Sequence, residues 1–235
     1  MPITKAVRGR EPNWKDWDQK AQKSGLRHTV FCGGGDTYVG HWENNLKHGK
    51  GTYHWAKANA VYDGDWREDK RHGYGTYSII VDEQPFKQYG GGWKNDKRHG
   101  YGTFYYTETE YYEGEWYENK RNGWGRMYFE DGSVYEGRWD NDMRDGEGTL
   151  KLPNNNRFEG LWSRDKKNGA GCHYYLDRGQ AYEGVWVENI PKCGEMRDIQ
   201  RDAAPRPTEY PIPTLELAQP AAVVSEARDT FMPED

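Results

Sequence analysis

A short phrase, Tyr-x-Gly-x-Trp with Phe once in place of Tyr, occurs seven times and restricts this chain to a repeat array. Its copies begin 24, 27, 23, 23, 23 and 24 residues apart. Such a period is typical of arrays in which each unit rests on its neighbours. The copies are Tyr38, Gly40 and Trp42; Tyr62, Gly64 and Trp66; Tyr89, Gly91 and Trp93; Tyr112, Gly114 and Trp116; Tyr135, Gly137 and Trp139; Phe158, Gly160 and Trp162; and Tyr182, Gly184 and Trp186.

The spacing inside each copy predicts a β-strand. Residues at offsets 0, 2 and 4 from the first aromatic share one face of a strand, and charged residues such as Glu113 and Glu115 alternate with them. A polar turn and a Gly-x-Gly motif follow in six copies, at Gly49/Gly51, Gly73/Gly75, Gly100/Gly102, Gly123/Gly125, Gly146/Gly148 and Gly169/Gly171. Two strands and two turns use the whole period, so each unit is a hairpin without room for a helix.

We expect a definite register within the hairpin. Offset 0 pairs with offset 15, offset 2 with 13 and offset 4 with 11. Tyr38 then faces Tyr53, the inner glycines face each other, and each Trp lies opposite a glycine that makes room for its indole. Replacing Gly102 or Gly125 with Val should therefore unfold the array locally.

The predicted fold is all-β: an elongated, twisted, single-layer antiparallel sheet with one aromatic-rich face. About 14 strands at ~4.8 Å spacing would span about 65 Å. We assign residues 1–35 to a basic arm, 36–198 to seven repeats, and 199–235 to a proline-rich acidic tail. Residues 14–24 and 221–231 are candidates for short helices. The end strands leave unpaired backbone groups, so self-association through a sheet edge is an expectation.

Composition excludes several classes. A disordered chain would be poor in aromatics, whereas 15% of these residues are aromatic. The net charge of −5 argues against nucleic acid as a partner. The sequence has no apolar run of membrane-spanning length and no signal-peptide core, and its three cysteines lie far apart. These features favour a reducing, cytoplasmic location.

No motif supports catalysis, a metal or a cofactor. His48, His72 and His99 share one repeat offset, but equivalent positions lie two strands, about 9.6 Å, apart. That distance is too long for one zinc ion, whose ligands bind at about 2.0–2.3 Å. Gly49-Lys50-Gly51-Thr52 lacks the remainder of a phosphate-binding loop. We predict that the protein is not an enzyme.

A row of basic residues is the candidate contact site for a partner or a lipid. Each member precedes the Gly-x-Gly motif by two residues: Lys47, Arg71, Arg98, Arg121, Arg144 and Lys167. A basic stripe could bind acidic head groups or an acidic protein. The alternative, which we favour, is ordinary solvated turn charge balanced by neighbouring carboxylates such as Asp69 and Asp96.

These residues resemble the MORN repeat, whose pattern is Tyr-x-Gly-x-Trp followed by a His-Gly-x-Gly-type turn. Lys47-His48-Gly49-Lys50-Gly51 and Arg98-His99-Gly100-Tyr101-Gly102 carry the second part most faithfully. The last copy departs from it, because Cys193 and Glu195 replace the two glycines and leave its second strand in question.

The flanks extend this resemblance. The stretch from Trp14 to Lys23 and the stretch from Pro205 to Pro213 are similar to those of a small vertebrate member of the family associated with sperm, cilia and flagella. The resemblance implies a non-catalytic scaffold that binds other proteins in a sperm axoneme or in the acrosomal region of the sperm head. A peripheral membrane module that binds acidic phospholipids is the alternative. A third reading, a carbohydrate-binding repeat, fits poorly with the missing secretion signal.

Overall fold

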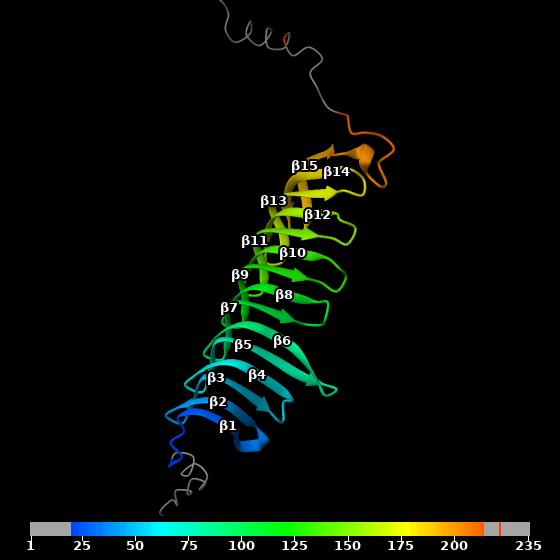
Figure 1. Cartoon of the computed structure of the whole chain (residues 1–235). Helices are drawn as coiled ribbons and strands as arrows, with labels where there is room; N and C mark the ends of the chain where they lie inside the picture. The colour runs from blue at the N-terminus through cyan, green and yellow to red at the C-terminus, as the bar shows by residue number, and fades with distance from the viewer. Residues whose placement is uncertain (1–19, 214–220, 222–235) are drawn as a thin grey trace, which may run out of the picture.

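The repeats form one continuous antiparallel sheet. A computed structural model describes residues 20–213 and residue 221, and its 15 strands pair in strict sequence order. In Figure 1 the strands lie as successive rungs along one long axis, and the sheet is curled. The strands are β1 (Gly25–Phe31), β2 (Thr37–Glu43), β3 (Leu46–Trp55), β4 (Ala60–Arg67), β5 (Lys70–Val81), β6 (Gln84–Lys94), β7 (Lys97–Tyr105), β8 (Tyr111–Tyr117), β9 (Lys120–Tyr128), β10 (Val134–Asp140), β11 (Met143–Lys151), β12 (Arg157–Ser163), β13 (Lys166–Tyr175), β14 (Gln180–Val187) and β15 (Ile190–Asp198). The predicted all-β class is confirmed.

Two-residue turns connect the two strands of each hairpin, and all of them lie along the same side of the sheet, at the strand ends. Both residues of each turn have φ between 47° and 75°. This is the left-handed pair that a type I′ turn requires, and its twist matches that of the flanking strands. The turns are Asn44-Asn45, Glu68-Asp69, Asn95-Asp96, Glu118-Asn119, Asn141-Asp142, Arg164-Asp165 and Glu188-Asn189. The longest period, 27 residues, arises because β5 and β6 extend to a tight turn at Asp82-Glu83.

The predicted register is right for the first aromatic and for the inner glycines, and it is wrong for the Trp. Tyr38 faces Tyr53 and Gly40 faces Gly51, as expected. A bulge then shifts the pairing, so that Trp42 lies opposite Lys47 rather than Gly49. Gly49 instead faces Trp66 of the next repeat. The sequence could not reveal this difference, because the bulge inserts extra residues into the second strand only.

The two glycines of the Gly-x-Gly motif have separate tasks, and neither is the one predicted. The first glycine lies in the bulge with a positive φ, 73° at Gly100, which β-carbon sterics disfavour. The second lies under the aromatic ring that opens the repeat. A Cβ on Gly102 would stand 2.3 Å from the Tyr89 hydroxyl oxygen. The space that the inner glycines clear is therefore filled by tyrosine and not by an indole.

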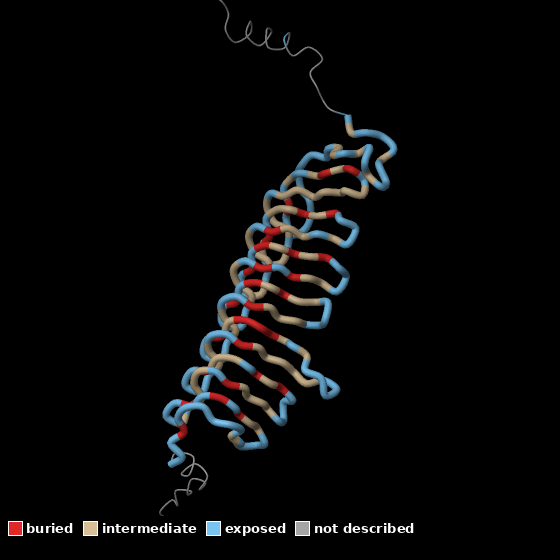
Figure 2. Tube along the Cα trace, in the orientation of Figure 1, coloured by how far each residue is buried: buried red, intermediate tan, exposed pale blue. Residues whose placement is uncertain are grey.

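One face of the sheet, here called the inner face, carries the core. Each repeat's first aromatic packs edge-on against its own Trp and against the next repeat's Trp. The ring centroid of Tyr112 lies 5.2 Å from that of Trp116 and 5.4 Å from that of Trp139. These rings are nearly or fully buried except that of Tyr182, which is partly buried, and Figure 2 shows buried positions recurring on successive rungs. Because the sheet has only one layer, the aromatic rings of each repeat are buried against the rings of the neighbouring repeats.

Hydrogen bonds lock the same rings. The Trp116 indole N–H donates to the Gly102 carbonyl at 3.0 Å, and four other repeats have the same bond. The Tyr112 hydroxyl donates to the Glu115 carbonyl at 3.0 Å, at the bulge. Burial raises the pKa of Tyr112, so this hydroxyl stays protonated and able to donate.

The ends of the array differ from the expectation of about 14 strands. β1 adds a strand within residues 1–35, so part of the predicted arm belongs to the sheet. In the last repeat the second strand, β15, forms although Cys193 and Glu195 replace the two glycines. Its pairing slips so that Gly194 faces Gly184, which preserves the glycine pair of the other repeats.

The candidate helices at 14–24 and 221–231 lie largely outside the described residues. The boundaries 36–198 and 199–235 remain predictions. Within the part of the chain that the structure describes, no helix has the length and apolarity needed to span a membrane.

Candidate interaction surfaces

The predicted basic row lies on the inner face and forms part of the connection between repeats. Each member stacks on the Trp of the following repeat, with the charged atom 4.2–5.3 Å from a ring centroid. Cation–π contact of this kind is worth about 0.5–1 kcal/mol at exposed sites and more when desolvated. The pairs are Lys47 with Trp66, Arg71 with Trp93, Arg98 with Trp116, Arg121 with Trp139, Arg144 with Trp162 and Lys167 with Trp186.

The same residues are also held by the turn of the following repeat. The Arg121 backbone N–H and side-chain Nε both donate to Oδ1 of Asp142, at 2.9 and 3.3 Å. The Asp142 backbone N–H donates in return to the Arg121 carbonyl at 3.0 Å. We call this arrangement of a basic residue, a Trp and an Asp or Asn in the next turn the inter-repeat staple.

Two of the six staples formed by the predicted basic row lack a carboxylate. Asn119 and Asn189 take the place of the aspartates that face Lys47, Arg71, Arg121 and Arg144. Burial lowers the pKa of Arg98, and burial together with Arg144 lowers the pKa of Lys167. Side-chain exposure of the four carboxylate-paired members is only 16–21%. The row is thus neither a free basic stripe nor simply solvated charge.

A staple residue that the sequence analysis missed precedes the first repeat. The Lys23 ammonium lies 4.5 Å from the Trp42 ring centroid, and the Lys23 backbone N–H donates to Asn45. Gly25 faces Trp42 as Gly49 faces Trp66. The signal was present as Lys23-x-Gly25, which matches Lys47-x-Gly49. β1 is therefore the second strand of a half-repeat.

The opposite, outer face presents a second surface that was not predicted. Tyr74, Tyr101 and Trp124 occupy the position between the two glycines in three consecutive repeats, and their residues are 62%, 56% and 47% exposed. We call these three residues the aromatic row. The signal was visible in the sequence as an aromatic between the glycines, but the side that it faces depends on the bulge.

Strand pairing places other residues in line with the aromatic row. Gly92 of β6 faces Tyr74, and Glu115 of β8 faces Tyr101. Glu115 Oε1 accepts the Trp124 backbone N–H at 3.1 Å, and Glu113 Oε1 accepts the Tyr101 hydroxyl at 3.0 Å. A shallow pocket of about 240 Å³ lies here, lined by Tyr101, Glu113, Trp124, Gly125, Arg126 and Glu136.

The three histidines of the repeat offset do not converge. His48 Nδ1 lies 3.2 Å from a Glu43 carboxylate oxygen, and the His99 ring packs 5.2 Å from Tyr117 between centroids. Among residues 20–213 and 221, no group of three or more His, Cys, Asp or Glu is arranged to hold a metal.

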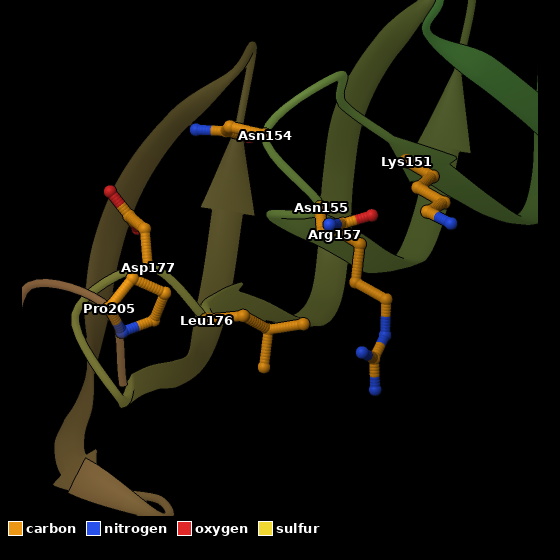
Figure 3. Close-up of a pocket in the computed structure, with 7 residues that line it drawn as sticks. All are labelled: Lys151, Asn154, Asn155, Arg157, Leu176, Asp177 and Pro205. Atoms are coloured by element: carbon orange, nitrogen blue, oxygen red, sulfur yellow. The ribbon is translucent and has the colours of Figure 1, made fainter. Parts of the chain in front are cut away.

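An open groove of about 510 Å³ lies near the C-terminal end of the sheet (Figure 3). It lies between the loops after β11 and β13 and the segment containing Pro205. The Arg206 backbone N–H donates to the Asp177 carbonyl at 2.9 Å, so this segment is fastened beside the groove. Its lining is largely apolar, and Lys151, Arg157 and Asp177 supply the charged groups.

Comparison with known proteins agrees with the repeat geometry. The MORN repeat model matches residues 38–59, 62–79, 89–108, 112–134, 135–157 and 158–179. The chain is 56% identical over 236 residues to MORN repeat-containing protein 3 of Xenopus laevis, covering 100% of this chain and 99% of that protein. It is 62% identical to the proteins of the same name from Mus musculus and Homo sapiens, covering 99% and 98% of this chain and 97% of each relative. The chain belongs to the MORN-repeat family.

Proposed function

We propose that this protein is a non-catalytic scaffold that binds other proteins in cilia or flagella, in the sperm axoneme or a sperm-head assembly. The observation that carries the proposal is the exposed aromatic row on a continuous sheet. Exposed aromatic side chains gathered on one face are typical of protein-binding surfaces. The cellular setting rests on the resemblance of the flanks to a sperm and ciliary member of the family.

The continuous sheet suits this role physically. Inter-repeat staples and edge-on ring contacts join all six pairs of successive complete repeats. Indole-to-carbonyl hydrogen bonds join five of these six pairs, and the last pair lacks one. An array with such repeated junctions holds its surface residues at fixed separations. A partner that contacts several repeats therefore meets a preformed surface, which lowers the ordering cost of binding.

Detergent fractionation of sperm, followed by immunoblotting of heads and flagella, tests the proposal. We expect retention on the demembranated axoneme, or in the detergent-resistant head fraction, through a moderate salt wash. Release of the protein with the detergent-soluble membranes would contradict a protein scaffold. Comparison of the axonemal and acrosomal fractions would decide between the two cellular locations.

Membrane binding through the basic row is the alternative to be tested in parallel. The inter-repeat staples already engage Arg71 and Arg121 with Asp96 and Asp142. We therefore expect no salt-sensitive flotation of the purified protein with vesicles that contain acidic phospholipids. Flotation that disappears at high salt would support the membrane alternative.

A further inference from the structure

The aromatic row is not required by the fold. Lys50, Glu147 and Ala170 occupy the same repeat offset in the first, fifth and sixth repeats, whose hairpins have the same glycine pairing. An exposed Tyr or Trp at this offset contributes little that Lys or Ala does not. Its occurrence in three consecutive central repeats therefore indicates a binding surface.

The spacing of the row matches one kind of peptide. Its residues lie on β5, β7 and β9, every second strand, so neighbouring members are about 9.6 Å apart across the sheet. A polyproline II helix has three residues per turn and a rise of ~3.1 Å, so its equivalent side chains recur every ~9.3 Å. Such a helix lying across the strands would place one residue per turn beside each aromatic ring.

The two positions between the rings differ: one has no side chain and the other carries a negative charge. Gly92, between Tyr74 and Tyr101, has no side chain that could cover the two rings, and the His99 carbonyl oxygen fills the place where its Cβ would stand. Glu115, between Tyr101 and Trp124, places a carboxylate beside a second carboxylate at Glu113. Proline rings fit between aromatic side chains, and a carboxylate attracts an arginine or lysine.

The other charged groups around this surface are largely paired. Lys50 lies 2.7 Å from Asp65, and Arg126 lies 2.9 Å from Glu136. Arg138 faces Trp124, the last residue of the aromatic row, from the neighbouring strand β10. The carboxylates of Glu113 and Glu115 therefore make the middle of the surface, between Tyr101 and Trp124, the favourable place for a positive charge.

We propose that the aromatic row binds a proline-rich segment of a partner protein in the polyproline II conformation, with a basic residue of that segment beside Glu115. The inference rests on the proposed scaffold function and names the chemistry of its partner. Prolines at every third position contact the rings, while the arginine or lysine lies between Tyr101 and Trp124, beside the carboxylate of Glu115.

Selection from a displayed library of short random peptides on the full-length protein tests this assignment. We expect enrichment of peptides with prolines three residues apart and one arginine or lysine. The Tyr74→Ala/Tyr101→Ala/Trp124→Ala variant should bind the selected peptide about tenfold or more weakly by fluorescence anisotropy. Glu115→Gln should weaken binding of the basic peptide more than that of its Arg→Gln version.

Matched controls separate the surface from the fold. Lys50→Ala and Glu147→Ala change the same offset outside the row and should leave the affinity unchanged. Thermal unfolding of every variant establishes that the sheet is intact. Enrichment of peptides without proline, equal affinity for the triple variant, or no enrichment at all would overturn the proposal. These outcomes would leave axonemal retention untouched, so failure here is distinguishable from failure of the scaffold function.

Discussion

At the residue scale, a tyrosine ring and a pair of facing glycines form the unit of the core. The ring of Tyr89 covers Gly91 and Gly102, which would otherwise weaken their strands, and its hydroxyl donates to the Gly92 carbonyl at 3.0 Å. An aromatic side chain that covers a strand glycine compensates for the buried area that glycine lacks. Glycine is needed because any Cβ would occupy the space of the ring.

The contact between Gly102 and the Tyr89 ring predicts that substitutions at these two positions affect stability in a coupled way. Gly102→Ala should cost about 1–3 kcal/mol of unfolding free energy, because its Cβ meets the Tyr89 ring. In a Tyr89→Ala background this cost should largely vanish. Gly100→Ala is the control: no atom lies within 4 Å of its added Cβ, so only its positive φ is strained and no coupling to Tyr89 is expected. Equal costs of Gly102→Ala in both backgrounds, measured by urea unfolding, would refute this role for Gly102.

The tyrosine hydroxyl is a separate contribution. Tyr112→Phe removes the bond to the Glu115 carbonyl and should destabilise the protein by about 0.5–1.5 kcal/mol. Phe158 occupies the equivalent position without a hydroxyl, so Phe158→Tyr should stabilise by a similar amount. Thermal melts of the two variants should shift in opposite directions, and a destabilised Phe158→Tyr would contradict the assignment.

His173 makes stability depend on pH. Burial, with a smaller effect from Lys167, lowers the pKa of His173 to about 4 in the folded state, against about 6.5 unfolded. The unfolded chain therefore binds more protons between these values, and stability falls as pH falls from about 6.5 towards 4. His173→Leu, which copies Leu150 of the preceding repeat, should reduce the acid sensitivity of urea unfolding. An unchanged pH profile would show that His173 is not the group responsible.

At the element scale, neighbouring hairpins are joined by the inter-repeat staples. The staple at Arg98 has an amide, Asn119, where the next has a carboxylate, Asp142. Both side chains accept the same backbone N–H bond, so the difference between them is one charge. The hairpins therefore offer a natural comparison of an ion pair with a neutral contact in the same geometry.

Asn119→Asp should add the missing ion pair and stabilise the protein by about 0.2–1 kcal/mol at low salt. Asp142→Asn should produce the reverse change while keeping the backbone bond. Both effects should shrink at high salt, because the carboxylates are partly exposed. Chemical unfolding at two salt concentrations measures this, and a salt-independent difference would exclude the ion pair as its cause.

At the scale of the whole molecule, the array has complete junctions in its middle and incomplete ones at its ends. Five of the seven repeat Trp residues donate their indole N–H to a neighbouring carbonyl, whereas the buried indole nitrogens of Trp42 and Trp186 have no hydrogen-bond partner in the described structure. In a quasi-one-dimensional array each unit depends on its neighbours. The terminal hairpins should therefore open first.

Hydrogen exchange can follow this gradient. We expect amides of β7 to β10 to exchange slowest and those of β1 and β15 fastest, because the end strands pair on one side only. Uniform protection from β1 to β15 would mean that the array unfolds as one cooperative unit, and fraying from the ends would then be excluded.

The amino-acid sequence alone determined the number of full repeats, their strand character, the glycine pair opposite glycine and the all-β class. These follow from a period of two within strands and a period of about 24 residues along the chain, both of which are local in the sequence. Only the tertiary structure decided the partner of each Trp, the tasks of the two glycines, the half-repeat at Lys23 and the face on which Tyr101 lies. Each of these depends on the bulge and on contacts between successive repeats, because pairing across strands brings together residues that no spacing within one repeat specifies.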